Sequence, residues 1–140
     1  AVVSSDQIVV IARTESPDDV GFSVRLGHRR SIMKSASGLV LFSFATPVYR
    51  AKMLEDLAEG GAQPSDMESL QASAHQVQET GYACMPSRMV DGVTDIGAPI
   101  FDSTSHGAVA KVTLQDAPGL VAEAAQRISA TLGYSPVSKS

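Results

Sequence analysis

The apolar residues at the start of the chain follow strand spacing. Residues 8–12, with the sequence Ile-Val-Val-Ile-Ala, form a short β-branched run before a Ser-Pro-Asp-Asp turn, which is typical of a buried strand. Phe22, Val24 and Leu26 alternate with polar residues, and this period of two predicts a second strand with one buried face. The valine pair at residues 2–3 is interpreted as the remnant of an earlier strand.

The pattern then changes to helical spacing. Residues 39–44 are apolar nearly all round, which predicts a short buried helix with Ser37 as its N-cap. Thr46 and Pro47 suit the N-cap and the first position of a second helix, which ends at the glycine pair 60–61. The apolar stripe predicted for this second helix consists of Val48, Ala51, Leu54 and Leu57.

A third helix is predicted between residue 65 and Gly81. The sequence Ser65-Asp66-Met67-Glu68 has the capping-box pattern, and Gly81 supplies the C-terminal stop. The apolar positions on one face of this helix are Met67, Leu70, Ala74 and Val77.

Strand spacing returns in the last part of the chain. Residues 82–85 predict a short strand. Residues 93–101, after an Asp91-Gly92 turn, and residues 109–114 predict a hairpin whose connection contains the six-residue polar turn 102–107. The apolar positions that line a closing helix, which stops at Gly133, are Val121, Ala125, Ile128 and Leu132. The order of strands, helices, strands and helix predicts an α+β fold with helices packed on a largely antiparallel sheet.

Composition limits the partners of this segment. A chain of 140 residues with 44% hydrophobic and 19% charged residues suits one globular domain. Its 11 basic and 15 acidic residues give a net charge of −4, so it has no excess of Lys and Arg with which to bind DNA, RNA or an anionic membrane. It contains no apolar run of the ~20 residues that a membrane span needs.

Cofactor and metal signatures are absent from the sequence. Cys84 is the only cysteine, which excludes an internal disulfide and favours a reducing, cytoplasmic setting. The spacings of the three histidines match no zinc site, and no stretch fits a nucleophile elbow, a P-loop or a dinucleotide-binding motif. We therefore expect no metal and no cofactor, and we interpret Cys84 as a buried small hydrophobe rather than a nucleophile.

One local feature could bind an anion. Ser35-Ala36-Ser37-Gly38 places small residues at the start of the buried helix, where unpaired N–H groups and the helix dipole attract negative charge. Plain capping with tight packing explains the same residues equally well. Arg29, Arg30 and Lys34 form a small basic cluster, which composition alone favours as a solvated strand end.

Five stretches together match one family. Residues 34–41 (Lys-Ser-Ala-Ser-Gly-Leu-Val-Leu) resemble an "A-S-G-x-A-L-L" segment, and residues 79–83 resemble "R-x-x-G-Y-A". Residues 91–102 resemble "x-G-V-x-x-I-A-A-P-V-F-D", residues 109–114 resemble "V-A-A-L-T-V", and residues 125–133 resemble "A-x-x-I-S-x-x-L-G". In this order and spacing the chain resembles the effector-binding domain of IclR-type transcriptional regulators.

The resemblance implies a fold and a division of labour. The fold would be GAF-like, with a curved, largely antiparallel sheet flanked by helices and a small organic effector, often a carboxylic acid, in a cup on the sheet. The family would assemble as a homodimer or as a tetramer of two dimers. DNA would be bound only by a winged helix-turn-helix domain before this one, so residues 1–140 are interpreted as an isolated regulatory domain that is not an enzyme.

The resemblance also assigns site residues. The backbone N–H groups of Ala36 and Ser37 would receive the effector carboxylate. The other positions that it places in the pocket or at its rim are Met85, Asp95, Thr113, Gln115 and Arg30.

Asp95 departs from the family pattern, because a buried carboxylate beside an anionic effector is unfavourable unless something pairs with it. Either Arg30 or Lys34 reaches Asp95, or the effector offers it hydroxyl or amine donors. Two alternatives to a sensor are an enzyme using Asp95 or Cys84 and an oligomerisation module with a vestigial cup. For an enzyme, the sequence shows no residue that would orient Asp95 or Cys84 for catalysis. For the vestigial cup, the apolar Met85 is an argument in favour, whereas the polar residues Thr113, Gln115 and Asp95 favour recognition of a ligand.

Overall fold

The computed structural model describes residues 1–13, 24–88, 91–101, 107–112 and 118–135. Its elements are strands β1 (Val2–Ser4), β2 (Gln7–Val9) and β3 (Arg29–Ser31), the 3₁₀ turn η1 (Ile32–Lys34), helices α1 (Ala36–Phe44), α2 (Pro47–Glu59) and α3 (Pro64–Thr80), strands β4 (Ala83–Pro86), β5 (Thr94–Phe101) and β6 (Gly107–Val112), and helix α4 (Pro118–Thr131).

The described strands form two small antiparallel sheets, ordered β1-β2-β3 and β4-β5-β6. In the first sheet Ile8 lies opposite Arg30, and in the second Met85 lies opposite Asp95. The sheets approach each other at β1 and β6. This arrangement confirms the predicted antiparallel α+β fold, with its strands divided between two sheets.

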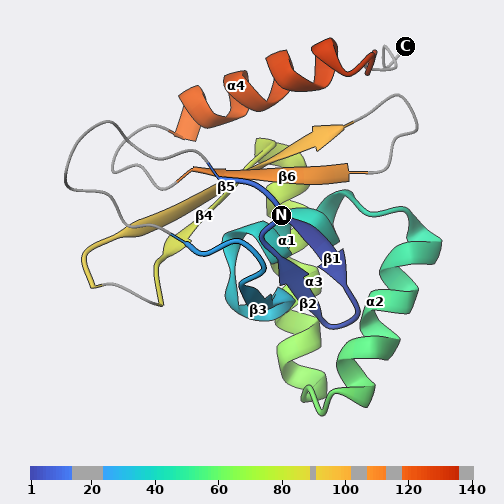
Figure 1. Ribbon diagram of the computed structural model, residues 1–140. Helices are drawn as coiled ribbons and strands as arrows, with labels where there is room; N and C mark the ends of the chain where they lie inside the picture. The colour runs from blue at the N-terminus through green and yellow to red at the C-terminus, as the bar shows by residue number, and fades with distance from the viewer. Residues whose placement is uncertain (14–23, 89–90, 102–106, 113–117, 136–140) are drawn as a thin grey trace.

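Helix α1 lies at the centre of the molecule, between the two sheets and against α3 (Figure 1). Helix α4 covers the other side of β5 and β6, at the top of the view. Because side chains alternate along a strand, β5 directs side chains both to the face covered by α4 and to the face that packs on α1. Ile96 and Ala98 join Val121 and Ala125 in a core under α4, whereas Asp95 and Gly97 belong to the side that faces α1.

Helix α1 is buried because its nine residues carry no charge. Ala36, Val40 and Phe42 have no exposed surface, and they form the main core together with residues of α2 and α3. Gly38 is required where α1 crosses η1, because a Cβ at this position would overlap the backbone of Ile32.

The N-cap of α1 is Ser35, so the prediction of Ser37 is wrong. The Gly38 N–H donates to Ser35 Oγ at 3.1 Å, and Ser35 has extended backbone angles. The helix begins earlier than its hydrophobic pattern, because the small residues 36–38 are helical but carry no apolar signal.

The start and end of α2 confirm the prediction, with Thr46 as N-cap and Pro47 in the first turn. Its buried face agrees with the predicted stripe only in part. Leu57 is buried as predicted, and Met53, one turn earlier, is buried although it was not predicted, while Val48 is 82% exposed. Ala51 is also exposed.

Helix α3 begins one residue before the predicted capping box. Its N-cap is Gln63 without a side-chain hydrogen bond, and Pro64 occupies the first turn, so Ser65 is already inside the helix. Leu70, Ala74 and Val77 are buried as predicted. Gly81 ends the helix with a φ of 82°, a conformation that favours glycine.

Two strand predictions are corrected. Strand β2 ends at Val9, so residues 10–12 are not part of it. Val24 to Leu26 are not a strand either, because Leu26 and Gly27 form a turn with a positive φ at Gly27 and pairing resumes only at Arg29. Phe22 lies outside the described residues.

The closing helix confirms the first half of the predicted row, Val121 and Ala125, and differs from the second half. Val121, Ala125 and Ser129 are buried, whereas Ile128 and Leu132 are 43% and 50% exposed. Ser129 takes the inward position because its hydroxyl accepts a hydrogen bond from the Phe101 N–H at 2.9 Å, which joins α4 to the end of β5. The predicted hairpin is confirmed in its strands β5 and β6, while residues 102–106 and Leu114 lie outside the described part of the chain.

Candidate functional site

The first turn of α1 has donors that the chain itself leaves unused. Ser35 satisfies two of the early N–H groups, that of Gly38 through its hydroxyl and that of Leu39 through its carbonyl. In the described part of the chain, the N–H groups of Ala36 and Ser37 have no acceptor, as helix geometry leads one to expect. This end of the helix can therefore receive an anion.

The Ser37 hydroxyl is buried and has no hydrogen-bond partner among the residues that the structure describes. Ser37 is 1% exposed, and its Oγ makes no hydrogen bond within the described residues. Burying an unpaired hydroxyl costs about 1–3 kcal/mol, so such a group in a folded protein calls for an explanation. An acceptor supplied by a bound molecule would remove that cost.

Strand β5 lies directly against this helix end. A Cβ placed on Gly97 would lie 3.3 Å from the carbonyl carbon and oxygen of Ala36, so the glycine permits a close backbone approach. Asp95 is two residues earlier on the same side of β5, and Met85 is its partner across the β4–β5 ladder. Ala36, Ser37, Asp95 and Met85 are thus brought to one region.

Arg30 reaches the same region from the other sheet. Its Nη1 lies 3.5 Å from Asp95 Oδ2, and the two side chains are only 12% and 4% exposed. Of the two basic residues considered from the sequence, Arg30 and not Lys34 pairs with Asp95, because Lys34 is exposed at the end of η1. The predicted site residues within the described chain therefore converge, while Thr113 and Gln115 lie outside it.

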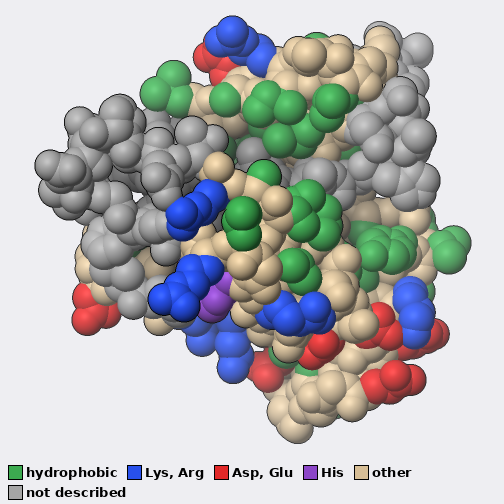
Figure 2. Space-filling model, in the orientation of Figure 1, with side chains coloured by type: hydrophobic (Ala, Val, Ile, Leu, Met, Phe, Trp, Pro, Cys, Tyr) green, Lys and Arg blue, Asp and Glu red, His purple; other side chains and the backbone are tan. Residues whose placement is uncertain are grey.

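Basic side chains surround the β2–β3 side of this region. Figure 2 shows Lys and Arg side chains gathered there beside a histidine, whereas acidic side chains lie over α2 and the lower end of α3. Arg25, Arg29 and Lys34 are exposed, and Arg29 is held by Gln7 Oε1 at 2.7 Å. A small anion approaching this side meets a favourable field despite the net charge of −4.

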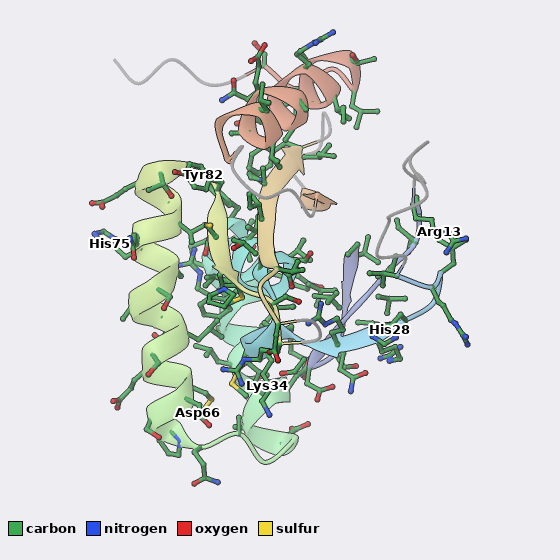
Figure 3. The ribbon with its side chains drawn as sticks, turned by 90° about the vertical axis from the view of Figure 1, so that its left-hand side faces the viewer. Arg13, His28, Lys34, Asp66, His75 and Tyr82 are labelled. Carbon is green, nitrogen blue, oxygen red and sulfur yellow. The ribbon has the colours of Figure 1, made fainter. Side chains whose placement is uncertain are left out.

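Other chemistry finds no support in the described residues. His28 lies beside β3 and His75 on the outer side of α3, far apart in the fold (Figure 3), and no group of three metal-ligating side chains occurs in the part of the chain described here. Cys84 is exposed, so its interpretation as a buried hydrophobe is wrong. The reason is that β4 is the edge strand of its sheet. Helix α4 lies on the same face as Cys84, but it packs on β5 and β6 and leaves the edge strand uncovered.

Sequence reasoning missed two contributors to this site. Ser35 caps the helix that carries Ser37, and Gly97 brings β5 against Ala36. A glycine inside a strand pattern is a known sign of close backbone approach, so Gly97 offered a signal. Which element approaches it could not be read from the sequence.

Comparison with known proteins gives one family. The family described as "Bacterial transcriptional regulator IclR C-terminal" matches residues 1–130. No curated protein matches the chain. Within the described residues, no helix combines the length and apolar character that crossing a membrane requires.

Solved structures with the same fold include three regulators. The repressor BlcR of Agobacterium tumefaciens aligns with a TM-score of 0.75 and 21% identity over 96% of this chain and 59% of its own. The C-terminal domain of Escherichia coli KdgR aligns with a TM-score of 0.72 and 21% identity over 95% of this chain and 85% of its own.

The third is an IclR homologue of Microbacterium hydrocarbonoxydans in complex with 4-hydroxybenzoate. It has a TM-score of 0.69 and 23% identity over 96% of this chain and 59% of its own. The chain therefore spans less than two thirds of BlcR and of this homologue.

Proposed function

Because the chain belongs to the IclR C-terminal family of bacterial transcriptional regulators, we propose that it senses a small organic acid, whose carboxylate binds at the N-terminus of α1. The family membership also agrees with the prediction that the chain is not an enzyme. Binding of the acid would change how a longer, cytoplasmic regulator holds DNA.

The Ser37 hydroxyl, which makes no hydrogen bond within the described part of the chain, carries this proposal. A carboxylate accepts several hydrogen bonds, and this helix end offers three donors, the hydroxyl and the N–H groups of Ala36 and Ser37. Hydrogen bonds from such donors to an ionised acceptor are stronger than neutral ones. The cost of the buried hydroxyl would then be recovered in the bound state.

The charge of the surroundings supports an anion rather than a cation. The helix dipole is positive at this end, and the charges of Arg30 and Asp95 offset each other in their ion pair. Thr113 and Gln115, which lie outside the described residues, remain proposed recognition positions on the strength of the family resemblance. The homologue bound to 4-hydroxybenzoate, a carboxylic acid, is consistent with this ligand class.

Signalling would pass through α1. This helix touches strands of both sheets, so a ligand at its first turn can bind one arrangement of the sheets better than another. Such differential affinity is the only way in which a ligand shifts a two-state equilibrium. DNA would be contacted by a winged helix-turn-helix domain outside this chain. The acidic net charge of residues 1–140 is compatible with that proposal, because these residues would not touch DNA.

We also propose that a second copy of the chain packs on the outer side of α4. Besides its inner face, this helix carries a row of exposed apolar residues spaced four apart, and hydrophobic side chains follow it along the top of Figure 2. The members of this outer row are Leu120, Ala124, Ile128 and Leu132.

Charge complementarity favours a second copy as the occupant. Glu123 and Arg127 flank the row, and neither forms an ion pair within the described residues. In an antiparallel pair of α4 helices about a two-fold axis, Glu123 lies near Arg127 of the partner subunit, and the reverse. A homodimer, or a tetramer of two dimers, would satisfy both charges twice.

Titration calorimetry with a panel of small hydroxy, keto and aromatic acids tests the sensor. We expect binding in the micromolar range, weakened at least tenfold in Ser37→Ala, with Ser73→Ala on the exposed face of α3 as the matched control. If no acid binds below millimolar concentration, the carboxylate proposal fails.

The assembly is tested separately by sedimentation. Ile128→Lys should produce monomers, whereas Val48→Lys, which alters an 82% exposed residue on α2, should leave the assembly unchanged. A wild-type chain that is monomeric at all concentrations would contradict the assembly and leave the sensor unaffected.

A further inference from the structure

Three aromatic rings from three different elements meet at the end of strand β5. Phe44 is the last residue of α1, Phe101 is the last residue of β5, and Tyr134 follows α4. The rings of Phe44 and Phe101 meet edge to face with centroids 5.6 Å apart, and those of Phe101 and Tyr134 stack with centroids 4.8 Å apart. Both are favoured arrangements of aromatic pairs. This aromatic stack of three residues therefore joins the C-terminal end of α1 to that of α4.

Backbone hydrogen bonds fix the end of α4 on the same residue of β5. The Phe101 N–H donates to Ser129 Oγ at 2.9 Å, and the Ser129 hydroxyl donates to the Ala125 carbonyl at 2.8 Å. After α4 the chain turns at Gly133, which has a φ of 83°, and the Tyr134 N–H donates to the Ser129 carbonyl at 3.0 Å. This turn brings the Tyr134 ring back onto Phe101. The C-terminal half of α4 is thus held by Phe101 through both its N–H and its ring.

The N-terminal half of α4 is held in a different way. Val121 and Ala125 pack with Ile96 and Ala98 in the core under α4. Within the described residues this core contains no residue of α1, and it lies on the face of β5 that is turned away from that helix. A change at α1 therefore reaches the C-terminal half of α4 through the aromatic stack, whereas the other half has no such connection.

Helix α1 joins the proposed carboxylate position to the stack. Its nine residues span about 13 Å, from Ala36 at the end that would bind the acid to Phe44 at the other end. Most of its residues are buried, and closely packed interiors transmit small displacements because they leave few voids to absorb them. Fixing the first turn of α1 therefore also restrains the ring of Phe44.

Resting on the proposed function, we infer that an acid bound at the first turn of α1 tightens the attachment of the C-terminal half of α4 to β5, and that the aromatic stack carries this coupling. A restrained Phe44 ring orders Phe101 and Tyr134, so this half of α4 opens less often. Because Ile128 and Leu132 of the proposed dimer surface lie on this half, the same coupling prepares α4 for a second copy.

Hydrogen exchange followed by mass spectrometry tests the coupling in residues 1–140. The acid is the member of a panel of lactate, pyruvate, benzoate and 4-hydroxybenzoate that binds most tightly by calorimetry. At saturation with this acid, we expect exchange in residues 126–135 to slow by a factor at least about five times that in residues 119–125. The N-terminal half of α4 is the internal control, because any ligand slows exchange throughout the chain by general stabilisation.

Substitutions in the stack then test which residues carry the coupling. Phe101→Leu keeps an apolar side chain but removes the central ring, so the two halves of α4 should respond to the acid within about twofold of each other, while the acid itself still binds. Tyr134→Ala removes the outer ring and should give the same result, so the test does not depend on the folding of Phe101→Leu. Tyr49→Ala, which removes a 47% exposed ring on α2, is the control and should keep the wild-type difference.

The outcomes separate this inference from the function on which it rests. Equal slowing of both halves of α4 in the wild-type chain overturns the coupling and leaves the carboxylate sensor intact. A difference that persists in folded Phe101→Leu or Tyr134→Ala overturns the role of the aromatic stack. Absence of binding by every acid in the panel overturns the sensor, and the coupling falls with it.

Discussion

The two ends of helix α1 are treated in opposite ways by the rest of the chain. At the C-terminal end, Arg50 Nη2 donates to the Ser43 carbonyl at 2.7 Å and to that of Ala45 at 3.3 Å, and Gln78 Nε2 donates to Ser43 at 2.6 Å. At the N-terminal end, two N–H groups and the Ser37 hydroxyl have no acceptor among the described residues. The chain supplies hydrogen-bond donors at one end (the closed end), and at the other end (the open end) the described residues supply no acceptor for these three groups.

This difference follows from what each end must do. Carbonyl groups at the end of a buried helix are costly unless donors reach them, and α2 and α3 supply those donors. The N–H groups at the other end carry the positive end of the helix dipole, which suits an anion. Because side chains of neighbouring helices satisfy the carbonyl groups at one end of α1, the N–H groups left without an acceptor at its other end point to a ligand.

The largest expected effect comes from disturbing the packing of the open end. Gly38→Ala places a Cβ into the backbone of Ile32 and should destabilise the chain by more than about 3 kcal/mol. Gly119→Ala, in the first turn of α4 where nothing lies within 4 Å, is the control and should change stability by less than about 1 kcal/mol. Urea denaturation measures both, and equal stability of the two variants would contradict the close approach.

Removing the cation beside the open end should have the next largest effect. Arg30→Met leaves Asp95 buried without Arg30, at a cost of about 2–3 kcal/mol, moderated because Arg30 is partly exposed. Arg29→Met removes the exposed neighbour and should cost less than about 1 kcal/mol. The double variant Arg30→Met/Asp95→Leu should recover much of the loss in thermal denaturation, and a failure to recover would mean that the pair is not the source.

Opening the closed end tests the comparison from the other side. Arg50→Met removes the donor to Ser43 and Ala45 and its contact over the Phe42 ring, 5.5 Å from the centroid, and should cost about 1–2 kcal/mol. Lys52→Met on the exposed side of the same helix should have little effect. If acid binding also changed in Arg50→Met, the two ends would be coupled through α1.

The smallest effect distinguishes a cap from a ligand donor. Ser35→Ala removes the Gly38 partner and should cost about 1 kcal/mol, while Ser37→Ala removes a hydroxyl that bonds nothing and should not destabilise the unliganded chain. With a bound acid the order reverses, because the thermal shift produced by the acid should decrease in Ser37→Ala. Equal losses without ligand would show that Ser37 has a structural partner.

Local sequence signals located most of the elements and several of their ends. Thr46-Pro47 and Gly81 mark helix boundaries through backbone chemistry that acts within a few residues, and the structure agrees with both. The wrong predictions fall where the local sequence contains no boundary signal or contains two residues that give the same signal. Ser35 and Ser37 are equally good N-caps in the sequence, and only the position of the helix start separates them.

The buried faces were harder to predict than the helices themselves. Val48 fits the helical period of α2 but lies beyond the part of α2 that packs, and Ile128 gives way to Ser129, which bonds Phe101. Hydrophobic periodicity locates the buried stripe of a helix only to within about one residue position around the helix axis. Which of two neighbouring residues is buried depends on the element that packs against the helix. Cys84 is exposed because it lies on the edge strand β4, and the described part of α4 packs on β5 and β6 instead.

The sequence by itself determined the family, the α+β class and the helix boundaries set by Pro and Gly, because these depend on residue type and spacing. The resemblance to the family also named Ala36, Ser37, Asp95 and Arg30 as candidate residues, which stay predictions. Only the tertiary structure decided that Arg30, and not Lys34, pairs with Asp95 across 65 residues, and that Gly97 meets Ala36. Contacts between distant segments depend on how the sheets and α1 pack together. That packing is a collective result of the core, and no single stretch of the chain encodes it.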